Sequence, residues 1–419
     1  MTGLVVFLVT LFVGVPIYVA IGLTSWVSMG SFPLTVLIDQ MVSALNSFPL
    51  VALPLFLLMG NLMGAAGITR TLVAFANMLV GRFRGGLSIG AIGSGVFFAS
   101  ISGSAAADTS ALASVLVPAM KEEGYSGGYS GALVAAAGTL GSIIPPSILL
   151  VIYGVQTGTS IEGLFVAGIL PGLVVAAGMI FLAIYIAHRR GYPLHRGVSM
   201  REGLRTTFRA LPVLMLPAIV IVGIIAGIFT ITESAAVAVA YAVVLVLVSR
   251  RIGAHRLWSI LIETAKETAS VTAVIAASAA LAWPLTRSQV PAELAAYVTQ
   301  EVASPVLILL LVNLLLLFLG MFLAPAAALV LVTPILLPIG HELGIGSLQL
   351  GLITVFNLNL GLLTPPVGLG LFITARIAGT TYLEQVREAL PFLAVNLLVL
   401  LGITYLPFVT TALPSYLGH

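Results

Sequence analysis

The chain has 419 residues, of which 60% are hydrophobic and only 7% are charged, with 17 Lys and Arg against 14 Asp and Glu. Soluble proteins carry roughly 25% charged residues, so this composition excludes a water-soluble globule and predicts an all-α protein that crosses a lipid bilayer many times. The sequence contains no Cys, which excludes disulfides, thiolate metal sites and cysteine nucleophiles.

Long apolar runs predict the membrane-spanning helices, each of which needs about 20 residues. Residues 1–69 contain no Lys or Arg to hold the N-terminus in the cytoplasm, so we predict that it faces outward. The predicted spans, in chain order, are 4–27, 49–67, 69–84, 127–155, 161–187, 209–229, 232–249, 268–286, 348–378 and 391–412.

Basic residues gather between the two halves of the chain. Cytoplasmic loops are enriched in Lys and Arg, so 188–208 is predicted to be a cytoplasmic connection between a first repeat, 1–187, and a second repeat, 209–419. Two amphipathic stretches, 31–47 and 258–266, are predicted to lie along membrane interfaces and to hold a frame still. The basic residues at the connection are Arg189, Arg190, Arg196, Arg201, Arg205 and Arg209.

Two regions between the spans, 88–120 and 303–340, are predicted to form re-entrant helical hairpins. The arms of the first, 88–101 and 105–120, measure roughly 20 to 25 Å at about 1.5 Å per residue, which is short of the ~30 Å hydrocarbon core. Lys and Arg flank the first hairpin but not the second, so the first should open to the cytoplasm and the second outward. The flanking residues are Arg82, Arg84 and Lys121 for the first hairpin, and Glu301, His341 and Glu342 for the second.

The chain carries an internal repeat with an offset of 220 positions. Every Pro between residues 102 and 171 falls on a Pro of the second half at this offset. Similarity at a fixed offset indicates a duplicated unit. Because the two hairpins should open to opposite sides, the copies are predicted to lie inverted in the membrane, which is typical of secondary transporters. The pairs are Pro118 with Pro338, Pro145 with Pro365, Pro146 with Pro366, and Pro171 with Pro391.

A double proline interrupts one apolar span in each copy. The pair removes two amide donors and forces the residue before it out of the α region, so both spans should break near the middle. Freed carbonyls in hydrocarbon survive only where protein, water or an ion satisfies them. Unwound carbonyls with Ser and Thr hydroxyls suit a hard monovalent cation, whereas half-helix N-termini suit an anion. The two breaks are therefore the predicted sites of transport.

Four motifs, spread over both halves, carry a specific resemblance. On these motifs the sequence resembles the large membrane subunit of the tripartite ATP-independent periplasmic (TRAP) transporters. The resemblance implies sodium-coupled symport of a carboxylate-bearing solute across the bacterial inner membrane, without enzymatic activity. It also implies two partners, a periplasmic substrate-binding protein and a small four-helix membrane subunit, which should here be a separate polypeptide. The motifs are SGSAAAD at 102–108, GSIIPPS at 141–147, TESA at 232–235 and GLLTPPVG at 361–368.

The same resemblance implies residues for two sodium sites and one solute site. Each sodium site would combine one hairpin with one broken helix, and the solute would bind between them. At the second tip Ala324 stands where the first tip has the hydroxyl of Ser104, so backbone carbonyls would supply more ligands there. The implied residues are Ser102, Ser104, Gly141 and Ile144 for the first sodium site, Gly320, Gly361 and Thr364 for the second, and Asp108, Thr139 and Asn359 for the solute.

Alternative interpretations stay open at this point. The resemblance implies Na⁺ as the coupling ion. A proton-coupled organic anion carrier of the same architecture is the closest alternative, and neither interpretation needs an organic cofactor. An intramembrane enzyme would need a catalytic pair at membrane depth, and a channel would need a continuous polar lumen. Asp108 could instead cap the second arm of its hairpin, as Glu233 could cap its own helix.

The repeat also predicts a mechanism. Two inverted hairpins, each paired with a broken helix, would form a compact core that carries its own ions. The simplest route to alternating access is then an elevator motion, in which this core slides across the membrane beside a fixed frame.

Overall fold

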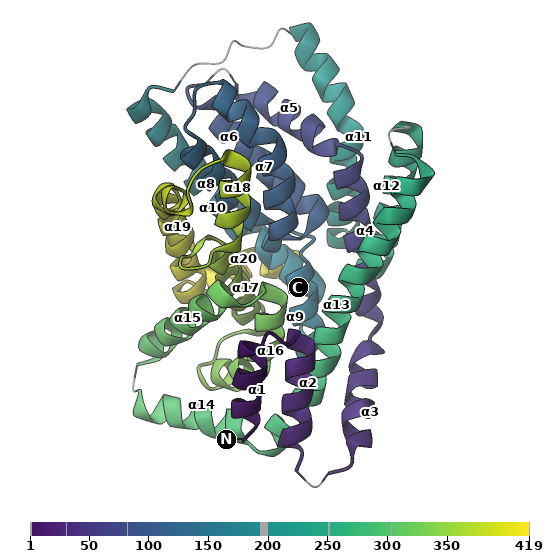
Figure 1. Ribbon diagram of the computed structural model, residues 1–419, viewed down its shortest axis with the longest axis vertical. Coiled ribbons are helices and arrows are strands. Elements are labelled where there is room, and N and C mark those ends of the chain that lie inside the picture. Colours follow the sequence, from purple (N-terminus) through teal and green to yellow (C-terminus); the bar gives the residue numbers. More distant parts are fainter. Residues whose placement is uncertain are drawn as a thin grey trace.

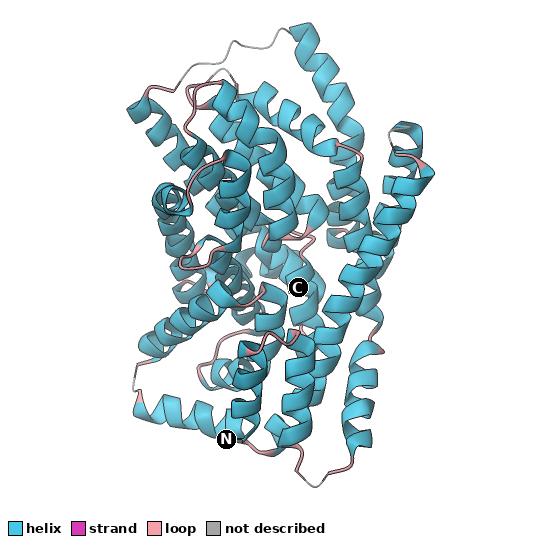
Figure 2. Cartoon of the chain, viewed as in Figure 1, coloured by secondary structure: helices cyan, strands magenta, loops and turns pink. Residues whose placement is uncertain are grey.

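The computed structural model describes residues 2–30, 32–81, 83–192, 200–249, 252–302 and 304–418, and every regular element within them is helical (Figures 1 and 2). Within these residues, eight helices are long and apolar enough to cross a membrane by length and composition. The predicted all-helical, multi-pass fold is therefore confirmed. Three of the predicted features, namely Arg82, Arg196 and the start of the second hairpin at residue 303, lie outside the described residues.

The first half of the chain is a series of helices in which short 3₁₀ turns occur at two places. In order these are α1 Thr2–Phe12, α2 Ile17–Ser28, α3 Leu34–Leu45, η1 Phe48–Val51, α4 Ala52–Ala65, α5 Ile68–Val80, α6 Gly86–Ser102, α7 Ala105–Glu122, α8 Gly127–Gly138, η2 Thr139–Ser142, α9 Ile148–Thr157 and α10 Ile161–Arg190.

The second half is also a series of α-helices, with one 3₁₀ turn, η3. Its elements are α11 Met200–Ile225, α12 Ile231–Ser249, α13 Ala254–Arg287, α14 Val290–Glu301, α15 Pro305–Phe322, α16 Pro325–Glu342, α17 Ser347–Leu360, η3 Gly361–Leu363, α18 Leu369–Ala378, α19 Tyr382–Tyr405 and α20 Phe408–Leu417.

Three predicted spans are wrong. The run 69–84 holds only the 13-residue helix α5, which at about 20 Å is too short to cross a membrane, so both its ends can lie on one side. A proline or glycine divides the other two. The run 4–27 is two helices, since Gly14 has a φ of 83° and Pro16 precedes the first residue of α2. The run 391–412 likewise divides before Pro407, which precedes α20. In both places the hydropathy stays high through the turn, so an apolar pattern alone does not reveal the interruption.

Charged residues caused the opposite error at three other places. The stretch 258–266 and the span 268–286, predicted as separate elements, form the single helix α13. The predicted connection 188–208 is shortened, because α10 continues to Arg190 and α11 begins at Met200. The short helix α14 was not predicted at all. Arg, Lys and Glu are good helix formers, so a helix continues through polar residues where a hydrophobic run stops.

Each predicted hairpin corresponds to two consecutive helices, and each double proline separates two helices as expected. Both arms of the second hairpin, α15 and α16, are themselves long and apolar enough to cross a membrane, so a re-entrant course stays a prediction. Helices α6 and α7 join at Gly103, and α15 and α16 join at Leu323 and Ala324. Elements of the same kind recur at the 220-residue offset: α7 spans 105–122 and α16 spans 325–342, while α8 begins at 127 and α17 at 347. Figure 1 shows α5, α6 and α7 toward one end of the long axis and α14, α15 and α16 toward the other. Their opposite orientation in a membrane stays a prediction.

A group of long helices lies beside these hairpins (Figure 1). We call α2, α3, α4, α12 and α13 the frame, because α4 packs against α12 and α13, and α13 packs in turn against α2 and α3. Asn61 of α4 donates to Thr264 at 3.0 Å and to Glu267 at 2.9 Å, both on α13. Helix α13 has 34 residues and is therefore about 51 Å long. We call α6–α9 and α15–α18, with η2 and η3, the core.

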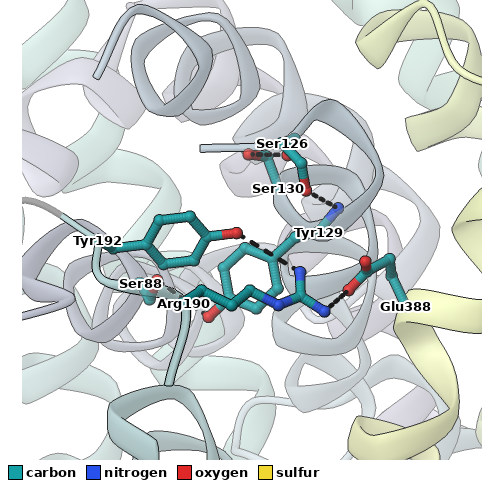
Figure 3. A network of polar contacts seen from close by, with 7 residues as sticks. All are labelled: Ser88, Ser126, Tyr129, Ser130, Arg190, Tyr192 and Glu388. Carbon is teal, nitrogen blue, oxygen red and sulfur yellow. Dashed lines mark hydrogen bonds and ion pairs between the residues drawn. The ribbon is translucent and has the colours of Figure 1, made fainter. Parts of the chain in front are cut away.

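A polar cluster ties the end of α10 to the core (Figure 3). Arg190 donates to Glu388 of α19 at 2.9 Å and to the Tyr192 hydroxyl at 3.5 Å. Its guanidinium also lies 5.4 Å from the ring centre of Tyr129, whose hydroxyl donates to Ser88 of α6 at 3.1 Å. The ion pair is part-exposed, so it adds about 1 kcal/mol or less. Its main effect is to fix the end of α10 against α6, α8 and α19.

Candidate functional site

The tip of the first hairpin lies directly against the first broken helix. The carbonyl of Gly103 accepts a hydrogen bond from the Ile148 amide at 3.4 Å. Gly103 has a φ of 65°, a conformation that favours glycine, and a Cβ there would lie 2.7 Å from the Pro146 carbonyl oxygen. A side chain at Gly103 would not fit, so the backbone of the tip lies close to the backbone of the break at this residue.

Asp108 projects from the first turn of α7 into this junction. Its carboxylate lies so close to Gly141 that a Cβ on that glycine would collide with Oδ2. The side chain is fully buried, and neither carboxylate oxygen has a hydrogen-bond partner among the described residues. Asp108, predicted for the solute, therefore lies beside Gly141, predicted for the first sodium site. Ser102, the last residue of α6, stands at the same hairpin tip.

The capping role considered for Asp108 does not match this geometry. An N-capping carboxylate accepts a hydrogen bond from a backbone amide in the first turn of its helix. Here Asp108 lies inside α7, its own amide donates to the Ser104 carbonyl at 2.9 Å, and its side-chain oxygens accept nothing. A buried carboxylate without a partner is costly, by several kcal/mol if it is ionised. Such a group needs a cation or a proton.

The second half brings two of its predicted residues into backbone contact. A Cβ on Gly361 would lie 2.6 Å from the Gly320 Cα, and one on Gly320 would lie 2.5 Å from the Leu358 carbonyl oxygen. The hydroxyl of Thr364 donates to the Leu360 carbonyl at 2.7 Å, so its proton is used within the break. The predicted role of backbone carbonyls as ligands at this site stays a prediction.

The two breaks also meet each other. Asn359 of α17 donates to the carbonyl of Thr139 in η2 at 2.7 Å, across 220 residues of sequence. Thr139 uses its own hydroxyl to donate to the Ala136 carbonyl at 2.7 Å. Asn359 and Asp108 are 0% exposed and Thr139 is 1% exposed. The side-chain oxygen of Asn359, Oδ1, has no hydrogen-bond partner among the described residues. All three predicted solute residues therefore lie deep inside the protein, closed to solvent in this conformation.

Two predicted sodium residues are placed less favourably. The side chain of Ile144 packs against Gly172 of α10, where a Cβ would lie 2.6 Å from it, so only its backbone could face an ion. Ser104 precedes the first residue of α7, is only part-buried, and its hydroxyl does not cap the helix. Its amide instead donates to the Ser102 hydroxyl at 3.3 Å.

Sequence reasoning missed two buried polar residues beside the breaks. The Ser142 hydroxyl and the Asn357 side-chain carbonyl are buried and lack a hydrogen-bond partner among the described residues. Ser142 follows Gly141 within η2, and Asn357 lies two residues before Asn359. A polar residue inside an apolar span was the available signal, since such residues are rare in membranes and usually face a site or a partner.

Asn357 in turn belongs to a network that holds the second hairpin. Its amide donates to the Asn313 side-chain oxygen at 2.7 Å and to the Asn313 backbone carbonyl at 2.9 Å. Asn313 donates onward to Thr404 of α19 at 3.1 Å. These bonds fasten the first arm of the second hairpin to the second broken helix.

The chemistry of this region is that of oxygen donors in a low-dielectric setting. Within the described ranges, no group of three or more His, Asp or Glu side chains could hold a metal ion. Buried oxygens without partners suit instead a hard cation such as Na⁺, or a proton. The unpartnered oxygens belong to Asp108, Ser142, Asn357 and Asn359.

Comparison with known proteins agrees with this architecture. A family model described as "Tripartite ATP-independent periplasmic transporter, DctM component" matches residues 4–409. The C4-dicarboxylate TRAP transporter large permease protein DctM of Pseudomonas aeruginosa is 40% identical over 372 residues, covering 88% of this chain and 87% of that protein. The sialic acid TRAP transporter large permease protein SiaM of Vibrio cholerae is 35% identical over 414 residues, covering 98% and 97%.

Two further similarities concern chain organisation and fold. The isethionate TRAP transporter permease protein DctMQ of Oleidesulfovibrio alaskensis is 36% identical over 406 residues, which are 96% of this chain but 64% of that protein. The crystal structure of the YdaH transporter of Alcanivorax borkumensis has a TM-score of 0.59 at 16% identity, covering 92% of this chain and 89% of that one, and shares the fold. These relatives are transporters and permeases rather than enzymes. The chain belongs to the DctM family, the large membrane component of tripartite ATP-independent periplasmic transporters.

Proposed function

We propose that this protein imports a carboxylate-bearing solute by Na⁺ symport across the bacterial inner membrane. The observation that carries the proposal is the buried, unpartnered carboxylate of Asp108 at the junction of the first hairpin and the first break. The relatives named for C4-dicarboxylates and for sialic acid support a carboxylate as the solute. Within a tripartite system, the solute would arrive on a periplasmic binding protein, and a small four-helix membrane subunit would complete the permease.

Electrostatics favours a cation as the coupling partner. A carboxylate solute entering the region of Asp108 would bring a second negative charge into a site without a basic side chain among the predicted residues. Two like charges about 4 Å apart repel by roughly 4 kcal/mol at an effective dielectric of 20. A Na⁺ ion bound at Ser102, Asp108 and Gly141 turns this repulsion into attraction. Solute binding would then depend on prior Na⁺ binding.

A proton on Asp108 would neutralise the same charge, so a proton-coupled organic anion carrier is the second candidate. The two candidates differ in their response to Na⁺ at fixed pH. Liposomes that contain this chain and its small subunit should accumulate solute only when binding protein and an inward Na⁺ gradient are both present. Replacing Na⁺ by choline at constant pH should abolish uptake in the Na⁺ symporter. Undiminished uptake in choline, driven by an inward proton gradient, would favour the proton carrier.

We further propose an elevator mechanism, in which the core moves past the frame. Two observations support it: the buried solute residues must travel to reach solvent, and the Asn359 bond to Thr139 joins the two breaks into one body. The tip of the first hairpin lies close to the frame at Gly60. A Cβ on Gly60 of α4 would lie 3.6 Å from the Ser102 Cβ, which is within the range of disulfides.

A disulfide between Cys residues at Gly60 and Ser102 should therefore arrest transport. We expect the double variant Gly60→Cys/Ser102→Cys to lose uptake when the two thiols are oxidised to a disulfide. Reduction of the disulfide should restore the uptake that the same liposomes showed before oxidation. The chain has no native Cys to interfere. A short crosslink within the frame, between Asn61→Cys and Thr264→Cys, should leave uptake unchanged. Uptake at the reduced level with the first pair fully crosslinked would rule out movement of the tip relative to α4.

A further inference from the structure

A cavity of about 500 Å³ lies at the turn from α4 to α5, where both helices meet the start of α11. It shares no residue with the site at the two breaks. At about 30 Å³ for each water, its volume would hold roughly fifteen waters. Its lining includes two arginines, two threonines and small residues that leave the space open, namely Arg70, Arg209, Thr71, Thr206, Ala66 and Gly67.

The two arginines give this cavity an uncompensated positive charge. Arg70 comes from α5 and Arg209 from α11, and neither guanidinium has a hydrogen bond or ion pair with any part of the chain that the structure describes. No Asp or Glu lines the cavity within the same described part. Both arginine side chains are exposed at the mouth of the cavity, where they attract anions from solvent. The lining therefore favours a negatively charged occupant.

The donor set points to a phosphate group. Arginine binds phosphate through paired N–H donors, and the hydroxyls of Thr71 and Thr206 can donate to further phosphate oxygens. Helix α5 also begins at the cavity, and its N-cap residue Gly67 offers no side-chain oxygen to the amides of the first turn. Those amides add partial positive charge on the same side.

The place of the cavity agrees with a head group at a membrane surface. Arg209 stands at the end of the basic connection, where the predicted apolar span 209–229 begins. Basic pockets between membrane helices on the cytoplasmic side bind the head groups of anionic lipids. The volume also exceeds what a bare phosphate ion needs. We propose that the cavity between α5 and α11 binds a phosphate group, supplied by the head group of an anionic phospholipid of the inner leaflet.

Lipid binding to the full chain with its small subunit, measured by native mass spectrometry, tests this proposal. The probes are dioleoylphosphatidylglycerol, dioleoylphosphatidylcholine and inorganic phosphate, each titrated separately. We expect the wild type to retain phosphatidylglycerol in preference to phosphatidylcholine. Each of Arg70→Gln and Arg209→Gln should weaken that binding about fivefold, and the double variant about thirtyfold. These factors correspond to a contribution of ~1 kcal/mol from each basic residue at a membrane surface.

Arg205→Gln is the matched control, because Arg205 lies one turn before Arg209 on the same helix but does not line the cavity. It should change phosphatidylglycerol binding less than twofold. Equal loss in Arg205→Gln and Arg209→Gln, or no loss in the double variant, would overturn the proposal. If inorganic phosphate binds as tightly as phosphatidylglycerol and displaces it, the phosphate site stands, but its ligand is soluble phosphate and the lipid is overturned as the source. Equal retention of phosphatidylcholine would overturn the site. Melting temperatures confirm that the variants remain folded.

Discussion

Replacing Gly361 by Ala is expected to abolish solute uptake and to lower the melting temperature of the protein. The added Cβ would overlap the backbone of Gly320, which belongs to the first arm of the second hairpin. Overpacking costs about 1 to 3 kcal/mol where side chains can adjust. Backbone atoms adjust less than side chains, so the cost here should reach at least ~3 kcal/mol and separate the arm from the break. Thermal unfolding in detergent and uptake in liposomes measure the two effects.

Gly402→Ala provides the control for this prediction. Gly402 also lies in a helix, α19, but a Cβ there would meet nothing within 4 Å. Ala is favoured over Gly within a helix by up to about 1 kcal/mol, so this variant should be as stable as the wild type or slightly more stable. If Gly361→Ala matched Gly402→Ala in both uptake and melting temperature, close approach of the two backbones would not be required for transport.

Asp108→Asn is expected to reduce Na⁺-dependent uptake at least about tenfold without unfolding the protein. Asn keeps the volume of the side chain but removes the charge. Interactions with a charged group contribute roughly 1.5 to 3 kcal/mol, which is about tenfold or more in affinity. The variant should therefore need far more Na⁺ for half-maximal uptake. In Na⁺-free buffer its stability should equal or exceed that of the wild type, because an unpaired buried charge has been removed.

The stabilisation by added Na⁺ separates this role from a structural one. A ligand that binds only the folded state stabilises it by an amount that grows with the logarithm of ligand concentration over Kd, so the wild type should gain stability with Na⁺ and Asp108→Asn should not. Ser102→Ala, which removes one hydroxyl oxygen, should show an intermediate Na⁺ requirement. Glu233→Gln is the control, since Glu233 is exposed and, among the described residues, accepts hydrogen bonds from Thr230 alone, at 2.8 Å. Equal Na⁺ stabilisation of wild type and Asp108→Asn would remove Asp108 from the ion site.

Local chemistry explains which parts of the structure could be predicted. The double prolines and the glycine at the first tip impose their backbone geometry wherever they occur, so the breaks and the first hairpin turn could be placed from neighbouring residues alone. The 220-residue offset then placed the second hairpin and second break without any knowledge of packing. The resemblance added Gly320 and Gly361, which indeed meet.

Contacts between distant segments could not be predicted in this way. The bond from Asn359 to Thr139 and the network of Asn357 with Asn313 depend on how whole helices dock, and a single sequence contains no direct record of that docking. The same holds for the side chain of Ile144, which turns toward α10 rather than toward an ion. The cavity with Arg70 and Arg209 joins two helices more than a hundred residues apart, and neither residue belongs to a motif.

The length of α13 has a consequence for the surrounding bilayer. A helix of about 51 Å exceeds a hydrocarbon thickness of ~30 Å, and helix tilts rarely exceed about 40°. Even at that tilt some eight residues must stand outside the hydrocarbon, and the end that carries Arg256, Glu263 and Glu267 is the polar one. A thicker or thinner bilayer would change this tilt and move the polar end relative to Asn61 of α4. Hydrophobic mismatch would thereby set the angle of the frame itself.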